Sequence, residues 1–477
     1  MPSGFSLARS GLKTWKTRSL PEIFYRALAE KRIQTAQGPV SLRDADRPLR
    51  LLRQKTVKPR EGVGLCFENG RDCLSFYAAL AMQRAVAVPL PPGLPALERQ
   101  RLWKRLGCRW VADETGLTPL QSKGTPPLWP EEIHWVMHSS GSTGVPKAIP
   151  LTLPAMVRNS RDVMRTLGLG TDLLHLGSMS QCYTNGLFNS FLLPLLTGGR
   201  VLTGPLVTAL KIPEYIRLIR DARPQILWVN PTVVAFLRRR AQPGDLASVK
   251  VLISCTAPLS QNECLAAEKA LRRPVLQSYG LTETLIVTVE KPGRDAQREF
   301  SAGIPVAGPR TFFLGKDSTL VIENGAVFPG YARKTRDQIA LSLPPGGKPE
   351  KTFMSGDSAR LARGRLHIEG RRTEVINVQG VKVSPGQIEG LLCRQEGVRS
   401  AVAVGRPDGR GSERPVVLIG AARGVKKTAL SDLCAERLGR HARPAAIHVV
   451  PQLPMTANGK IDRVAALKLI RQRSGGG

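Results

Sequence analysis

Short apolar stretches alternate with longer amphipathic ones from about residue 63 to residue 271. Apolar stretches such as residues 226–229 have the length of buried strands, and stretches such as residues 153–167 repeat their apolar side chains with the period of a helix. Strands that alternate with helices at this rhythm build parallel sheets covered on both faces. This part of the chain is therefore predicted to be α/β, with αβα subdomains built on parallel sheets.

The pattern changes after about residue 300. Shorter strands, such as residues 319–322 and 365–368, are separated by glycine and proline turns, which predicts a β-rich subdomain. Strands and helices mix again near the C-terminus, for example in residues 415–420 and 428–438. We therefore predict a large N-terminal domain of residues 1–370, a polar hinge at residues 371–373 and a small α+β C-terminal domain of residues 374–477.

The charge of the chain allows three interpretations. With 477 residues and 42% hydrophobic side chains the chain can bury several cores, yet it carries a net charge of +33. Such a charge fits nucleic-acid binding, attraction to acidic partners, or an arginine-rich composition spread over the surface. The basic residues are spread along the chain, without zinc-ligand spacing or a basic motif interleaved with aromatics. Nucleic-acid binding is therefore disfavoured, and the third interpretation is favoured with a contribution from the second.

The eight cysteines indicate reduced thiols. None belongs to a Cys-x-x-Cys pair, and the six histidines do not cluster with them, so the pattern predicts a cytoplasmic protein without a cysteine–histidine metal site. The longest apolar runs, such as residues 191–196, are far shorter than the roughly 20 residues that a membrane-spanning helix needs. We expect no membrane span.

A loop rich in hydroxyls and glycines follows the apolar strand predicted at residues 133–137. Hydroxyl groups donate hydrogen bonds to phosphate oxygens, and glycines let backbone N–H groups approach them closely. The loop residues suited to phosphate are Ser139, Ser140, Gly141, Ser142, Thr143, Gly144 and Lys147. A Walker-type loop would have glycine before the lysine and Ser or Thr after it, whereas Pro146 and Ala148 stand there. The sequence predicts a nucleotide-phosphate loop of another type.

Four later stretches carry further side chains suited to a nucleotide. Tyr279 offers an aromatic face for a base, and Glu283 offers a hard oxygen ligand for Mg²⁺. Asp357, after a tight turn, offers two carboxylate oxygens to a ribose diol. Arg371 stands in the polar hinge, and Lys460 stands in a Gly-Lys turn near the C-terminus. Alone, each has an ordinary structural interpretation, such as a buried tyrosine in a loop, an aspartate in a turn or a solvated lysine.

Taken in order, these five stretches resemble the motifs of the adenylate-forming superfamily, which includes acyl-CoA synthetases, aryl-CoA ligases, non-ribosomal peptide adenylation domains and luciferases. The resemblance runs from about residue 20 to residue 463. It implies that the phosphate loop, residues 139–147, closes on the β- and γ-phosphates of ATP. The other ATP- or AMP-binding residues that it implies are Thr256, Ala257, Pro258, Ser278, Tyr279, Gly280, Asp357 and Arg371.

The resemblance also implies a reaction in two steps. A carboxylic acid attacks the α-phosphorus of ATP to give an acyl-AMP and pyrophosphate, and the acyl group then passes to the thiol of CoA or of a carrier-protein phosphopantetheine. The implied catalytic residues are Lys460, Thr282 and Glu283, and Glu283 is also the implied ligand of Mg²⁺. Between the steps a mobile C-terminal domain rotates about the hinge at Thr373, and Gly380 leaves room for the thiol arm.

Two positions depart from the family pattern. The hinge residue is Thr373 where the family usually has Asp or Lys, and Tyr183 stands where acyl-CoA synthetases carry a histidine and amino-acid adenylation domains carry an acid. An α-amino acid is therefore a disfavoured substrate, because Tyr183 cannot bind its ammonium group. The implied acid pocket has a mostly uncharged lining, suited to an aliphatic or aromatic acid, made by Tyr183, Asn185, Asn230, Thr232 and Ile286.

The predicted function is that of an ATP-dependent carboxylate ligase with a thiol acceptor. The acid is small and stays unidentified. An acidic acyl or peptidyl carrier protein is one candidate acceptor, because a net charge of +33 attracts acidic proteins. Two alternatives stay open, namely a ligase that uses an amine acceptor and forms an amide, and a basic nucleic-acid-binding relative without ligase activity.

Overall fold

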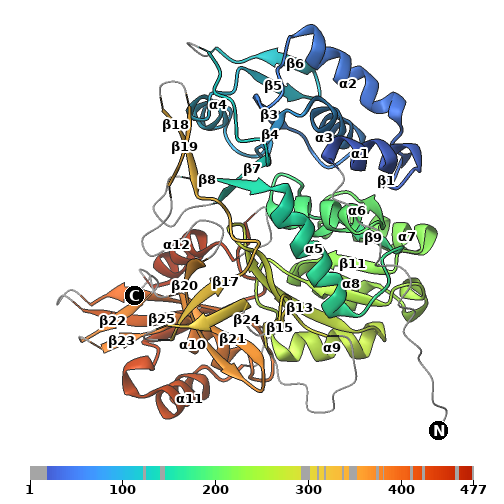
Figure 1. Cartoon of the computed structure of the whole chain (residues 1–477). Coiled ribbons are helices and arrows are strands. Elements are labelled where there is room, and N and C mark those ends of the chain that lie inside the picture. The colour runs from blue at the N-terminus through green and yellow to red at the C-terminus, as the bar shows by residue number, and fades with distance from the viewer. Residues whose placement is uncertain are drawn as a thin grey trace.

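The fold is that of a computed structural model. It describes residues 19–121, 125–139, 146–291, 301–308, 311–315, 318–335, 338–342, 352–371, 375–379, 381–408, 412–421, 425–456 and 461–474. Figure 1 shows α/β subdomains in blue and green, followed by β-rich segments in yellow and orange. The predicted α/β class is confirmed. The domain boundaries stay predictions, since residues 372–374 lie outside the described ranges.

The first sheet has the strand order β19-β18-β8-β7-β4-β3-β5-β6. Its strands are β3 (Gly62–Cys66), β4 (Val86–Pro89), β5 (Trp110–Asp113), β6 (Gly116–Pro119), β7 (Ile133–Ser139), β8 (Lys147–Thr152), β18 (Tyr331–Lys334) and β19 (Ile339–Ser342). The helices of this region are α1 (Leu20–Ala29), α2 (Leu42–Gln54), α3 (Arg71–Gln83) and α4 (Ala96–Arg105). The sheet is parallel at its centre and antiparallel at both ends, where hairpins join it. One of them, β18–β19, comes from far later in the chain and pairs with β8 through Ala332 opposite Ala148.

The second sheet has the order β15-β14-β13-β12-β11-β9-β10-β1-β2. Its strands are β1 (Ile33–Thr35), β2 (Gly38–Pro39), β9 (Leu174–Gly177), β10 (Arg200–Thr203), β11 (Ile226–Val229), β12 (Val251–Ser254), β13 (Val275–Leu281), β14 (Leu285–Val289) and β15 (Ile304–Pro305). Its helices are α5 (Leu153–Leu167), the π-helix η1 (Asn185–Leu192), α6 (Leu193–Leu196), α7 (Ile212–Ala222), α8 (Pro231–Arg240), the 3-10 helix η2 (Pro243–Leu246) and α9 (Gln261–Leu271). The ring of Phe24 contacts those of Trp135 and Phe191 in a core cluster that includes residues of both sheets.

The apolar residues 187–196 predict a helix, and the segment is helical, but it does not form one regular α-helix. The structure has the π-helix η1 followed by the short α6. Pro194 has no N–H to donate back to residue 190, so the α-helical hydrogen-bond pattern cannot run through this segment. π-Helical turns are frequent at functional sites, and η1 begins at the predicted pocket residue Asn185.

A third, antiparallel sheet of order β16-β17-β20-β21 forms the predicted β-rich subdomain. Its strands are β16 (Phe312–Leu314), β17 (Thr319–Glu323), β20 (Thr352–Ala362) and β21 (Arg365–Arg371). The remaining elements are β22 (Ile376–Val378), β23 (Val381–Val383), α10 (Pro385–Leu392), β24 (Val398–Pro407), β25 (Glu413–Ala421), α11 (Lys427–Leu438), the 3-10 helix η5 (Arg440–Ala442), β26 (Ala446–Val450) and α12 (Arg463–Ser474).

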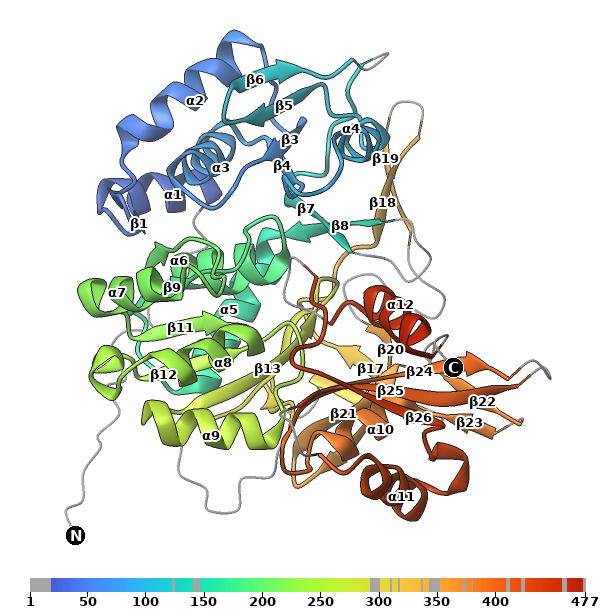
Figure 2. The same ribbon diagram turned by 180° about the vertical axis from the view of Figure 1, so that it is seen from behind.

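The C-terminal sheet β24-β25-β26 carries helices on both faces (Figure 2). Val402 and Leu418 pack against Ile470 of α12, whereas Val417 and Ile419 pack in the cluster that holds α10 and α11. This region contacts the rest of the chain closely, because a side chain at Gly386 of α10 would overlap the carbonyl oxygen of Glu369 in β21. Among the described residues, none of the helices combines the length and the hydropathy that crossing a membrane requires.

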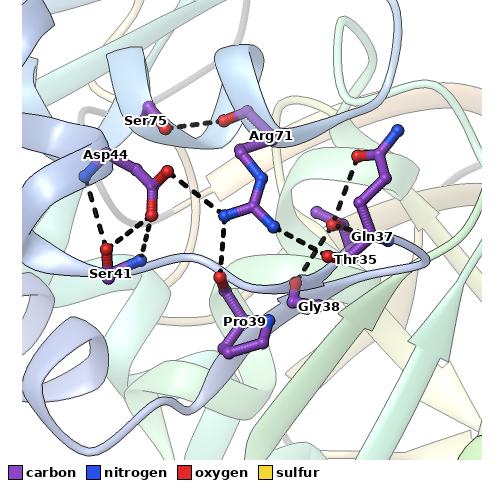
Figure 3. A network of polar contacts seen from close by, with 8 residues as sticks. All are labelled: Thr35, Gln37, Gly38, Pro39, Ser41, Asp44, Arg71 and Ser75. Carbon is purple, nitrogen blue, oxygen red and sulfur yellow. Dashed lines mark hydrogen bonds and ion pairs between the residues drawn. The ribbon is translucent and has the colours of Figure 1, made fainter.

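A polar network ties α2 and α3 to the segment before them (Figure 3). The guanidinium of Arg71 donates to the carbonyls of Gln37 and Pro39, both at 2.9 Å, and to Asp44 at 3.2 Å. Asp44 in turn accepts from the backbone N–H and the hydroxyl of Ser41, at 2.7 and 2.6 Å, in a capping box at the start of α2. This network fixes the N-terminal elements on one another.

Candidate active site

Three residues predicted to bind the nucleoside lie together where the second and third sheets meet. The hydroxyl of Tyr279 on β13 donates to Asp357 on β20 at 2.6 Å, and Nε of Arg371 on β21 lies 3.2 Å from the other carboxylate oxygen. Burial, with the negative charge of Asp357, raises the pKa of Tyr279 well above its usual range. The structure brings these predicted residues together, and their roles stay predictions.

The backbone around these residues differs from the expectation. The sequence predicts only a short strand at residues 275–276 before the tyrosine motif, but strand β13 continues to Leu281, because it pairs with β14, with Ser278 opposite Val289. Asp357 follows Gly356, which has φ +75°, but it lies inside the long strand β20 opposite Arg371 rather than in a loop. Gly280 sits at a bulge where a Cβ atom would overlap the carbonyl oxygen of Leu285, so glycine is required there.

A second cluster contains the predicted metal ligand. Glu283 accepts a hydrogen bond from the hydroxyl of Tyr331 at 3.0 Å, and the ammonium of Lys147 lies 4.8 Å from the centre of the same tyrosine ring. Burial raises the pKa of Glu283, although its own backbone N–H, Tyr331 and the charges of Lys147 and Arg371 oppose the rise. Arg371 acts electrostatically on both Glu283 and Tyr279, so the two clusters form one site.

Tyr331 was not identified from the sequence. It lies on β18, a short strand without apolar alternation, and no motif surrounds it. The only local signal is Gly330, whose φ of +135° marks a turn into the strand. Its place in the site depends on the pairing of β18 with β8, which no local pattern reveals.

The turn predicted to line the adenine has a strained backbone. Thr256 has φ +78°, an unusual conformation for a β-branched residue, and its buried hydroxyl has no partner among the described residues. Ala257 and Pro258 follow it, and Gln277, the first residue of the tyrosine motif, accepts from the N–H of Leu259 at 2.8 Å. Strain and an unpartnered polar group together are typical of a ligand site.

The predicted acid-pocket residues fall into two groups. Tyr183 and Asn185 are partly exposed, next to Thr184, whose hydroxyl lies 3.0 Å from that of Thr282. Asn230 caps α8, since its side chain accepts from the N–H of Val233 at 2.9 Å, and Thr232 lies in the first turn of the same helix.

Ile286 lies apart from both groups, on β14. It is only 3% exposed. Its carbonyl accepts from the side-chain NH₂ of Asn159, and its N–H donates to the side-chain oxygen of the same residue. Tyr183, Asn185, Asn230 and Thr232 are all partly exposed, and they are therefore better placed to touch a substrate than the buried Ile286.

Several predicted residues lie outside the described residues. They are Ser140, Gly141, Ser142, Thr143 and Gly144 of the phosphate loop, the hinge residue Thr373, Gly380 and Lys460. The ends of two of these segments are described: Ser139 pairs with Lys147 at the β7–β8 hairpin, and Met455 pairs with Ile461 on either side of Lys460.

The donor set fits a metal ion that a nucleotide helps to hold. In the described ranges no group of three or more His, Cys, Asp or Glu side chains could hold a metal ion. Glu283 would supply a single carboxylate to such an ion, and Mg²⁺ is commonly bound by one or two carboxylates together with substrate phosphates. The neighbouring Lys147 adds a positive charge suited to phosphate.

Comparisons with known proteins identify the family of this chain. A family model described as AMP-binding enzyme matches residues 43–330, and the model of the AMP-binding enzyme C-terminal domain matches residues 387–460. The chain is 30% identical over 358 residues to the sulfoacetate–CoA ligase of Cupriavidus necator, a match that covers 72% of this chain and 68% of that protein.

A second relative is far longer than this chain. The isonitrile lipopeptide synthase of Mycobacterium tuberculosis is 29% identical over 454 residues, which covers 85% of this chain and 17% of that protein. Among solved structures, the anthranilate CoA ligase AuaEII in complex with anthranoyl-AMP is similar, with a TM-score of 0.79 and 19% identity. That likeness covers 96% of this chain and 98% of the other, and it shows a shared fold.

Proposed function

We propose, because the chain belongs to the family of AMP-binding enzymes, that it activates a small carboxylic acid as an acyl-AMP and transfers the acyl group to a thiol. The family predicted from the motifs is confirmed, and with it the class of adenylate-forming ligase. The sulfoacetate–CoA ligase and the acetyl-coenzyme A synthetase among the relatives are acid–thiol ligases by name.

One observation carries the proposal. A buried carboxylate, Glu283, and the lysine of the phosphate loop, Lys147, meet at Tyr331, next to the Tyr279–Asp357–Arg371 cluster. In the proposed reaction these residues would supply a metal ligand, a phosphate cation and a ribose acceptor in one site. Attack of a carboxylate on a phosphate brings two anions together, so the reaction depends on positive charge placed in advance.

The cofactors follow from the same residues. ATP is the nucleotide, with Asp357 at the ribose, Tyr279 and Thr256 near the adenine, and Lys147 at the phosphates. Mg²⁺ is proposed at Glu283, where it would neutralise charge on the phosphates during pyrophosphate loss. The acyl acceptor is CoA or the phosphopantetheine of a carrier protein, and an acidic carrier protein would be attracted by the net charge of +33.

The acid is proposed to be small and to lack an α-ammonium group. Tyr183, which burial gives a raised pKa, is a neutral phenol, and Asn185 beside it is uncharged, so neither can pair with an ammonium. The carboxamide oxygen of Asn185 already accepts from Asn189 at 3.1 Å, which orients its NH₂ group as the remaining donor.

A panel assay tests the proposal. Purified full-length protein is given ATP, Mg²⁺ and one acid at a time, from short aliphatic to aromatic, and pyrophosphate release is measured. Each active acid is then combined with CoA, a pantetheinylated carrier protein or an amine, and the product is identified by mass spectrometry. Thioester formation supports the proposal, amide formation supports the amine-acceptor alternative, and failure of every acid to release pyrophosphate contradicts both.

The predicted catalytic lysine allows a sharper test of the two steps. Lys460→Ala is expected to lower the rate of acyl-AMP formation by about a hundredfold or more. The reason is the loss of the ammonium that stabilises the transition state at the α-phosphate. Thioester formation from a supplied acyl adenylate should be largely spared, since the lysine acts in the first step. Equal loss of both half-reactions would contradict this assignment.

A further inference from the structure

Tyr331 lies between two oppositely charged groups of the site. Its hydroxyl donates to Oε1 of Glu283 at 3.0 Å, and its ring face holds the ammonium of Lys147 at 4.8 Å. No ion pair within 4.0 Å joins Lys147 directly to Glu283 in the described part of the chain. A phenol can do both, because its face attracts cations while its hydroxyl donates to anions.

The position of Tyr331 is fixed by its surroundings. Its strand β18 pairs with β8, the strand that begins at Lys147, through Ala332 opposite Ala148. Phe328 packs edge-on against the tyrosine ring, with 4.8 Å between the ring centres, and its N–H donates to the carbonyl of Glu283 at 2.8 Å. The ring is therefore held by the same elements that carry the carboxylate and the lysine.

We propose that Tyr331 is a positioning residue that keeps Lys147 and Glu283 apart, so that the carboxylate stays available to the metal ion and the lysine to the phosphates. This rests on the proposed function. Without the tyrosine, a flexible lysine next to a buried carboxylate would form a direct ion pair, because burial makes an uncompensated charge costly. Such a pair would occupy both groups before Mg²⁺ and ATP arrive.

Two substitutions separate the two contacts. Tyr331→Phe keeps the ring under Lys147 and removes only the hydroxyl bonded to Glu283. Tyr331→Leu removes both, so it permits the direct ion pair. Tyr25→Phe, at an exposed tyrosine on α1, is the matched control for loss of a hydroxyl.

The measurement is the binding of a non-hydrolysable ATP analogue to the full-length protein by calorimetry, over a series of Mg²⁺ concentrations. Tyr331→Leu is expected to raise the Mg²⁺ concentration for half-saturation by about tenfold, and Tyr331→Phe by only a few fold. Adding Lys147→Met to Tyr331→Leu should bring the Mg²⁺ concentration for half-saturation most of the way back to the wild-type value, because the competing ammonium is gone. A merely structural tyrosine would show no such rescue.

The outcomes separate this inference from the proposed function. If the wild-type protein fails to bind the analogue with Mg²⁺ and releases no pyrophosphate, the proposed function fails. If the wild-type protein binds it and Tyr331→Leu matches the wild type, the positioning role is overturned. If Tyr331→Leu does not fold, Tyr331→Phe decides, and an unchanged Mg²⁺ dependence in that variant overturns the role.

Discussion

Two carboxylates of this chain lie in opposite electrostatic environments. Asp44 belongs to the network that ties α2 to α3 (Figure 3). Burial alone would raise its pKa, but hydrogen bonds from Ser41 and Arg71 lower it. Glu283 belongs to the candidate active site, and there burial prevails over the surrounding donors and raises the pKa.

The difference lies in how completely each charge is compensated. Asp44 receives two bonds from Ser41 and one from the guanidinium of Arg71. The side-chain donor to Glu283 is the neutral hydroxyl of Tyr331, and Lys147 is turned to the ring of that tyrosine. A buried carboxylate that is poorly compensated gains most from an added cation, whereas a well-compensated one fixes the structure. Substitutions at the two sites should therefore affect different properties.

The largest effect is expected from Glu283→Gln. Losing the proposed metal ligand should lower kcat/KM for pyrophosphate release by about a hundredfold or more, because charge at the transition state is no longer neutralised. The resistance to urea should stay the same or rise, since a poorly compensated buried charge is removed. Kinetics and the midpoint of urea unfolding check this. A large loss of stability with kcat/KM retained would instead mean that Glu283, like Asp44, serves to stabilise the fold.

Arg71→Ala is expected to lower the stability of the fold and to leave catalysis unchanged. This change removes the donor to the carbonyls of Gln37 and Pro39 and to Asp44, and should lower the free energy of unfolding by about 2 kcal/mol. Kinetic constants at a temperature where the variant is folded should stay as in the wild type. Arg71→Lys is the control, because it keeps the charge without the forked geometry and should recover only part of the loss. Reduced activity with unchanged stability would contradict the division between the structural network of Asp44 and the candidate active site of Glu283.

The sequence predicted local features well and long-range contacts poorly. Helix α5 begins and ends at the predicted residues 153 and 167, because its apolar period and its boundary residues are local signals. The motif residues Tyr279, Asp357 and Arg371 come together as the family resemblance implied. Tyr331 was missed, since its contacts arise only when hairpin β18–β19 pairs with a strand from much earlier in the chain.

The underestimated length of one strand has the same physical origin. Strand β13 runs past Leu276 because β14 pairs with its extension, and no local pattern separates such a strand from a loop. The cap that Asn230 forms before Pro231 is a local signal, whereas the buried position of Ile286 depends on tertiary packing, which a resemblance in sequence does not convey. For Lys460 and Thr373, outside the described residues, the predictions stand as made.

The pH dependence of stability tests whether the charge of Asp44 stabilises the fold. Its folded-state pKa lies below the ordinary value of 3.8, so its stabilising contribution is present above pH 3.8 and is lost as the pH falls through the lowered pKa. Asp44→Asn should cost about 1.5 kcal/mol of stability at neutral pH. The cost should shrink as the pH falls below 3.8. Urea midpoints from pH 7 down to pH 3 check this, and a cost independent of pH would contradict the role of the charge.

The smallest effect is expected at Asn230. Substitutions there test whether its side chain only caps α8 or also contacts the acid substrate. Its side chain caps α8, so Asn230→Ala should lower the free energy of unfolding by about 1 kcal/mol, while Asn230→Ser should keep the cap. If capping is its whole role, the ratios of kcat/KM over a panel of acids stay as in the wild type for both variants. A changed ratio in Asn230→Ser, with stability retained, would mean that the amide contacts the acid, and one side chain would then serve both the fold and the pocket.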